Sequence, residues 1–86
     1  MPEKEGLDFS TFTLSLATSA QVHLGLVPNP STGALEKNLA LAKETIDLLG
    51  ILQDKTKGNL SDQEAMLLEH VLYDLRMMYV EMGKKG

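Results

Sequence analysis

The chain has 86 residues, enough for one small domain near the lower size limit for independent folding. Hydrophobic residues make up 43% and charged residues 23%, which is the balance of an ordinary globular protein rather than a disordered one. The net charge of −4 argues against nucleic-acid binding, which depends on Lys and Arg, and the lack of cysteine excludes disulfides, thiol catalysis and thiolate metal sites.

The first unusual stretch is an uncharged run of 27 residues from Phe9 to Leu35, without Asp, Glu, Lys or Arg. A membrane span needs about 18 nearly continuous apolar residues, and polar side chains interrupt residues 9–27 too often for that. The opening residues, Met1 to Gly6, are acidic and do not have the basic start of a secretory signal. We therefore expect a soluble, cytoplasmic protein with no membrane span.

A single helical domain is predicted over residues 9–82, with a flexible tail at residues 1–8 and another at residues 83–86. Asp8 is the expected N-cap of the first helix, and Leu7 and Phe12 have the spacing of a hydrophobic staple. Apolar residues then recur every three or four positions, which favours a helix over a strand. The predicted apolar stripe consists of Phe9, Phe12, Leu16, Ala20, Leu24 and Val27, and the opposite side of Thr11, Ser15, Thr18, Ser19 and Val22.

Gly25 and the sequence Val27-Pro28-Asn29-Pro30 are expected to end this helix, because proline lacks an amide donor and disfavours helical geometry before it. Residues 31–37 continue the connection as a loop. The segment Asn29–Gly33 has one glycine and no following lysine, so it does not match a phosphate-binding loop. Turn chemistry explains its composition better.

The second helix is predicted over residues 39–57 with Asn38 as its cap, although Ser31 or Thr32 could start it earlier. The third is predicted from the capping box Ser61–Glu64 to about Met82. The short link between them predicts an antiparallel hairpin, with the first helix packed across it in an all-α fold. Gly50 inside the second helix indicates a close crossing. The expected seams are Leu39, Ala42, Ile46 and Leu49, widened by Leu41, Leu48 and Leu52, on the second helix, and Ala65, Leu68, Leu72, Leu75, Tyr79 and Met82 on the third.

A second apolar stripe on the third helix lies nearly opposite the first, and one hairpin partner cannot cover both. Met and Tyr on this stripe suit a recognition surface. We therefore predict a homo-oligomer, most simply a two-fold dimer. The predicted interface combines this stripe with residues of the first helix: Phe12, Ser15, Ser19, Val22, Met66, Tyr73, Met77 and Val80.

The sequence predicts no catalytic, cofactor or metal site. His23 and His70 are the only histidines, and their spacing is not that of a metal site. We expect His23 at the core edge with a local hydrogen bond, and His70 in solvent. The serines of the first helix have no nucleophile-elbow motif. Sheltered carboxyls are needed for acid–base catalysis, and four of the acidic residues are expected at the surface instead: Glu44, Asp47, Glu64 and Asp74.

Several separate segments together resemble a known family. They are FSTF at residues 9–12 continuing to SA at 19–20, HLGL at 23–26, LAK at 41–43, TIDLL at 45–49 and LYDLR at 72–76. The chain is similar, over about residues 9–82, to the bacterial domain-of-unknown-function family eighteen forty-four. The resemblance implies a short bacterial cytoplasmic protein, and it implies no activity, cofactor or catalytic residue.

The favoured function is a structural or interaction module without catalytic activity, whose helical surface binds itself or another protein. Two alternatives stay open. The first helix could lie on a membrane surface as a peripheral anchor, although such helices usually carry Lys or Arg on the polar face and this one has none. An enzyme could use His23 or His70 at a subunit interface.

Overall fold

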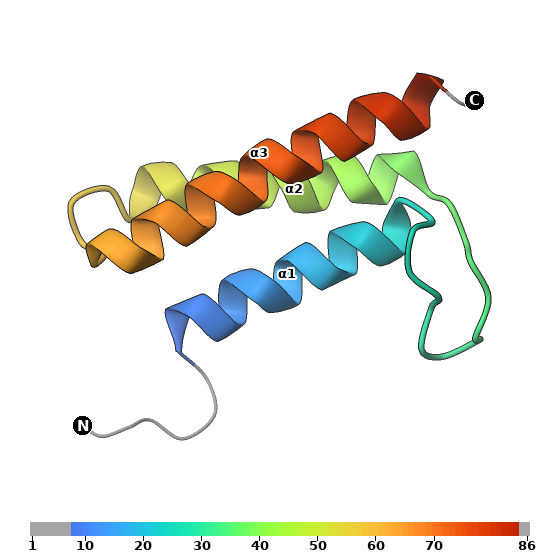
Figure 1. The fold of residues 1–86 in the computed structure, drawn as a ribbon, viewed down its shortest axis with the longest axis horizontal. Helices are drawn as coiled ribbons and strands as arrows, with labels where there is room; N and C mark the ends of the chain where they lie inside the picture. The colour runs from blue at the N-terminus through green and yellow to red at the C-terminus, as the bar shows by residue number, and fades with distance from the viewer. Residues whose placement is uncertain (1–7, 85–86) are drawn as a thin grey trace.

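The computed structural model describes residues 8–84, and within that range it contains three helices and no strand. The helices are α1 (Phe9–His23), α2 (Leu39–Lys55) and α3 (Asp62–Lys84). Helices α2 and α3 run antiparallel, and α1 lies lengthwise against both in the direction of α3 (Figure 1). The predicted all-α fold with its hairpin is confirmed. The expected staple with Leu7 lies outside the described residues, as do residues 1–7 and 85–86 of the predicted tails.

Both ends of α1 are closed by the residues that the sequence indicated. The Asp8 carboxylate caps the start by accepting a hydrogen bond from the Thr11 amide at 2.8 Å. At the other end Gly25 has a φ of +82°, in the left-handed region that favours glycine. Its amide donates to the Val22 carbonyl, and the Leu26 amide donates to the Gln21 carbonyl, both at 3.0 Å. This Schellman motif satisfies carbonyls that the helix end leaves free.

The connection between α1 and α2 is fastened at its two ends. Leu24 and Lys37 form an isolated antiparallel bridge, and the Asn38 amide donates to the His23 carbonyl at 2.7 Å. The Lys37 ammonium also donates to the Met82 carbonyl near the end of α3, at 3.4 Å. These contacts hold the beginning of α2 against the ends of α1 and α3.

Turn chemistry organises the rest of this connection, as predicted. The Asn29 side chain accepts from the Ser31 amide at 2.8 Å, and the Gly33 amide donates to the Asn29 carbonyl at 2.6 Å. The Glu36 carboxylate accepts from the Asn29 side-chain amide at 3.0 Å and from the Thr32 hydroxyl at 2.9 Å. The polar side chains of the loop are therefore used to hold the loop itself together.

The hairpin is closed by the predicted caps, although its helices end at other residues. The Ser61 hydroxyl accepts from the Glu64 amide at 3.1 Å, and the Glu64 carboxylate accepts from the Ser61 amide at 2.9 Å. Helix α2 ends at Lys55 rather than at residue 57, because the backbone leaves helical geometry at Thr56 and the Lys57 amide donates to the Asp54 carbonyl, three residues back instead of four, at 3.4 Å. Helix α3 continues through Gly83 to Lys84 instead of stopping near Met82.

The core is a small aliphatic cluster where the three helices meet. Its buried hydrophobic residues are Ala20, Leu24, Ala42, Ile46, Leu49, Leu68, Leu72 and Leu75. Two predicted core positions on α1 and α3 are wrong. Ala65 is exposed because it lies in the first turn of α3, beside a hollow at the α2–α3 turn. Phe12 is 37% exposed because α1 is rotated so that Thr13 takes its place in the core.

Thr13 is the one polar residue fully buried within residues 8–84, and its hydroxyl has no hydrogen-bond partner there. An unsatisfied buried hydroxyl costs about 1–3 kcal/mol. We expect Thr13→Val to raise the free energy of unfolding by about 1 kcal/mol in urea denaturation, since a methyl group of similar size replaces the hydroxyl. The control is Thr18→Val, whose exposed hydroxyl donates to the Leu14 carbonyl at 3.0 Å and whose loss should change little. A lower stability for Thr13→Val would contradict the prediction.

Candidate functional site

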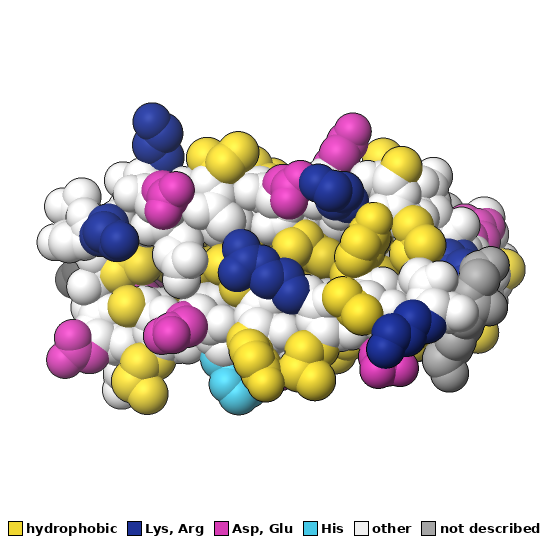
Figure 2. Space-filling view, turned by 90° about the horizontal axis from the view of Figure 1, so that it is seen from above, with side chains coloured by type: hydrophobic (Ala, Val, Ile, Leu, Met, Phe, Trp, Pro, Cys, Tyr) yellow, Lys and Arg dark blue, Asp and Glu magenta, His cyan; other side chains and the backbone are white. Residues whose placement is uncertain are grey.

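Large hydrophobic side chains remain exposed on more than one face of the bundle. They include all four residues of the second stripe predicted on α3, which we call the α3 stripe: Met66, Tyr73, Met77 and Val80. Their exposed fractions lie between 51% and 68%. Figure 2 shows hydrophobic side chains gathered over one face of the molecule, with Lys or Arg and Asp or Glu side chains between them. The hairpin therefore leaves the α3 stripe uncovered.

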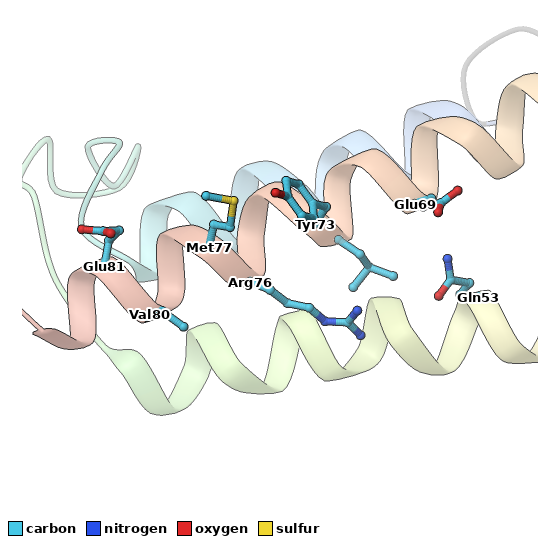
Figure 3. A pocket seen from close by; sticks show the side chains of 8 residues that line it. Gln53, Glu69, Tyr73, Arg76, Met77, Val80 and Glu81 are labelled. Atoms are coloured by element: carbon cyan, nitrogen blue, oxygen red, sulfur yellow. The ribbon is translucent and has the colours of Figure 1, made fainter.

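The α3 stripe borders an open groove of about 540 Å³ between α2 and α3. Its lining residues are Gln53, Glu69, Leu72, Tyr73, Arg76, Met77, Val80 and Glu81. In Figure 3 the Arg76 side chain reaches from α3 toward α2, and the Gln53 side chain points from α2 toward α3. The groove is thus an apolar surface with a cation and two carboxylates at its edges.

Arg76 occupies the groove because α2 has a glycine beneath it. A Cβ added at Gly50 would lie 3.3 Å from Nη2 of Arg76, tighter than most real contacts of a Cβ atom. The close crossing predicted at Gly50 is therefore with an arginine side chain. Within residues 8–84 the guanidinium forms no ion pair and no hydrogen bond. The planar guanidinium can bind a carboxylate through two parallel hydrogen bonds. None of the described carboxylates forms an ion pair with it.

The predicted interface residues of α1 lie apart from this groove. Phe12, Ser15 and Ser19 are exposed and Val22 is half-buried, but none of them lines the groove, whose residues come from α2 and α3 alone. The structure brings the four α3 residues together along one helix face. It does not join them to the α1 residues through this groove.

The outer side of α2 carries a further apolar surface that the sequence assigned to the core. Leu41 and Leu48 were expected to widen its seam, yet they are 41% and 42% exposed, and Ile51 is 54% exposed. Leu52 is half-buried as expected for the edge of a seam. Leu41, Leu48 and Ile51 remain exposed because a narrower row of residues, Ala42, Ile46 and Leu49, already makes the contact of α2 with the core.

Sequence reasoning missed the charged members of the groove. Glu69 and Arg76 are seven residues apart, the same spacing that relates Met66 to Tyr73 and Tyr73 to Val80. Residues seven apart share one side of a helix, so this spacing was the available signal. Gln53 could not be found in this way, since its place depends on how α2 packs against α3.

The two histidines occupy different settings, and neither lines the groove. His70 is exposed, with Nε2 at 3.4 Å from Oδ2 of Asp74, which agrees with the predicted solvent position. His23 is half-buried at the end of α1, at the expected core edge. The predicted local hydrogen bond of its imidazole is absent within residues 8–84. The main-chain carbonyl of His23 instead accepts a hydrogen bond from the Asn38 amide.

The acidic residues singled out by the sequence serve local structure. Asp47 accepts a hydrogen bond from Lys43 at 2.8 Å, and this bond, together with the carboxylate charge, raises the pKa of Lys43. Glu64 belongs to the capping box and Asp74 lies beside His70. Glu44 is exposed. Among the described residues no group of three His, Asp or Glu side chains is arranged to hold a metal ion.

The fold and the groove together define a small three-helix protein with an uncovered apolar helix face, and no helix in residues 8–84 is long and apolar enough to cross a membrane. The family described as a domain of unknown function (DUF1844) matches residues 6–81. The chain belongs to this family, which confirms the resemblance noted in its sequence. Comparison with curated proteins and with solved structures gave no match.

Proposed function

We propose that the protein is a homo-oligomeric helical interaction module without catalytic activity, and that it binds a second copy through the α3 stripe. The observation that carries the proposal is the exposure of this stripe on a helix whose other side forms the core. Contiguous exposed apolar surface marks interaction sites on folded proteins. Tyr, Met and Arg, which meet in this groove, are also the residues enriched in such interfaces.

A cytoplasmic location accompanies this proposal. The sequence has no cysteine, so the fold is held without the disulfides that are common in small secreted domains. The chain instead relies on a core of eight buried hydrophobic residues. A small core gains from further burial, because association adds apolar surface to what the monomer removes from water.

The contacts of α1 favour this proposal over a peripheral membrane anchor. Ala20 and Leu24 are fully buried in the core and Leu16 packs against it, so α1 uses its apolar side within the protein. Its exposed residues include Phe12 and Leu14 beside Thr11 and Thr18, and none of them is basic. An anchoring helix needs its apolar side free for lipid, with basic residues flanking it.

The test is the molar mass in solution. We expect multi-angle light scattering at micromolar concentration to give about twice the chain mass of 9.4 kDa, as a two-fold dimer requires. The variant Tyr73→Ala/Met77→Ala should shift the protein toward monomer, because it removes the two central side chains of the stripe. Far-UV circular dichroism should leave the helix content unchanged, since both side chains are more than half exposed.

A matched control separates the α3 stripe from exposed apolar surface in general. Leu48→Ala/Ile51→Ala removes two side chains of similar exposure from the outer side of α2 and should leave the mass of the dimer unchanged. A wild-type protein that stays a 9.4 kDa monomer at tens of micromolar would rule out self-association. A dimer that only the α2 variant dissociates would move the interface to α2.

A further inference from the structure

We propose that the second copy docks with its α3 antiparallel to the first, about a two-fold axis beside Tyr73, so that Glu69 of each chain pairs with Arg76 of the other. The proposal rests on self-association through the α3 stripe and specifies the orientation and the pairing. It assigns to Arg76 a carboxylate that residues 8–84 of its own chain do not supply.

The exposed face of α3 is arranged symmetrically about Tyr73. Met66 and Val80 lie seven residues before and after it, while Glu69 lies four before and Arg76 three after. In an antiparallel two-fold pair, a residue before the axis faces the residue at the same distance after it in the other chain. Met66 then faces the partner's Val80. Glu69 and the partner's Arg76 are offset by one residue, about 1.5 Å along the axis, which is within the reach of these two long side chains.

The same symmetry extends to the ends of the helix. Asp62 lies eleven residues before Tyr73 and Lys84 lies eleven after it, and both are exposed. At 100° per residue they project on the same side of α3 as the stripe. In an antiparallel dimer, Asp62 therefore lies near the partner's Lys84 and Glu69 near the partner's Arg76, so acidic side chains meet basic ones at both places. Between these two pairs, Met66 meets the partner's Val80.

Charge selects this orientation over the parallel one. In a parallel pair each residue faces its own copy, so Glu69 would meet Glu69 and Arg76 would meet Arg76, which is repulsive. In the antiparallel pair each of these contacts joins opposite charges. Within one chain Glu69 and Arg76 are separated by about 10.5 Å along the helix axis, and no ion pair joins them.

The geometry of the groove agrees with a helix lying over it. Arg76 is exposed, but its guanidinium reaches across the groove to Gly50 of α2. Glu69 borders the same groove two turns earlier. A partner helix running along the stripe passes over both Glu69 and Arg76. Both side chains are therefore in place before association to form ion pairs with the partner chain.

Charge reversal tests the pairing. Glu69→Arg alone and Arg76→Glu alone each place like charges opposite one another twice per dimer, and we expect each to weaken self-association by about tenfold or more in analytical ultracentrifugation. An equimolar mixture of the two variants should associate nearly as tightly as wild type, because each chain then carries the charges that the other needs. Glu44→Arg, a reversal on the outer side of α2 away from the groove, is the matched control and should leave the dissociation constant unchanged.

Disulfide trapping tests the orientation independently, since the natural chain contains no cysteine. Chains carrying Met66→Cys and Val80→Cys should link when mixed and oxidised mildly with oxidised glutathione. Neither should link to itself, because identical positions would stand about 21 Å apart along the axis and a disulfide needs Cα atoms within about 7 Å. Self-linking of each variant alone would show a parallel pair and overturn the proposal.

The outcomes separate this inference from the proposed function. A wild-type dimer whose association neither reversal changes, or whose mixed reversals do not recover, overturns the antiparallel pairing and leaves self-association standing. A wild-type monomer overturns both. Circular dichroism of each variant checks the fold, and all four substituted positions on α3 are exposed, so none contributes a buried side chain to the core.

Discussion

We expect Leu72→Ala to lower the free energy of unfolding by about 2–5 kcal/mol, while Tyr73→Ala changes it by no more than about 0.5 kcal/mol. The two residues are neighbours on α3, yet Leu72 is 1% exposed in the core and Tyr73 is 64% exposed on the stripe. Truncating Leu72 leaves a cavity as well as removing buried apolar surface. A small domain has a total stability of only about 5–15 kcal/mol, so this loss is a large share.

Urea denaturation followed by circular dichroism measures both variants. The protein concentration should be low enough to keep each chain monomeric, because association stabilises the folded state by mass action. Tyr73→Ala then reports on the fold alone. Equal losses for the two variants would mean that Tyr73 is part of the core, and the α3 stripe would no longer be a candidate interface.

The second large effect is expected at the end of α1, where Gly25→Ala should lower the free energy of unfolding by about 2 kcal/mol. Gly25 has a φ of +82°, which costs a residue with a Cβ about 1–2 kcal/mol. The added Cβ would also lie 3.3 Å from Cβ of Lys37, across the bridge that fastens the loop. Backbone strain at residue 25 and crowding against Lys37 therefore both destabilise the Gly25→Ala variant.

Gly33→Ala is the matched control for this second variant. Gly33 has a similar φ of +74°, but no heavy atom lies within 4 Å of the place of its Cβ. It should show the backbone cost without the crowding, and so a smaller loss in the same urea titration. Equal losses at the two glycines would show that the contact with Lys37 adds nothing.

The hairpin was predictable because its signals are local. The caps at Asn38 and at Ser61 and Glu64 depend on residues within one helical turn, and the structure forms the predicted bonds. The core seam of α2, from Leu39 to Leu49, follows from charged residues that mark the opposite side of the helix. In such a helix the charges fix the centre of the inward side but not its width, since Leu41 and Leu48 are exposed.

The rotation of α1 was not predictable in the same way. The helix has no charge to mark an outward side, so Phe12 and Thr13 were both acceptable in the core by pattern alone. Packing against α2 and α3 decides between them, and it buries Thr13 at the cost of an unsatisfied hydroxyl.

The candidate site was predictable in its apolar part and not in its charged part. Met66, Tyr73, Met77 and Val80 stood out because one neighbour cannot cover two sides of α3. Arg76 was grouped with ordinary surface charge, and its position in the groove follows from Gly50 on another helix. That contact depends on the register between α2 and α3, which the sequence of either helix alone does not give.

The fastened connection between α1 and α2 has a practical consequence for engineering this chain. Because the bridge between Leu24 and Lys37 fixes both ends, added length at the tip does not pull on either helix. Doubling the length of a flexible loop costs only about 0.6 kcal/mol in closure entropy. The loop between α1 and α2 extends from one end of the bundle (Figure 1), and Gly33 within it is exposed. An epitope or a fluorescent reporter inserted there would label the protein while leaving the helix ends and the exposed side of α3 unchanged.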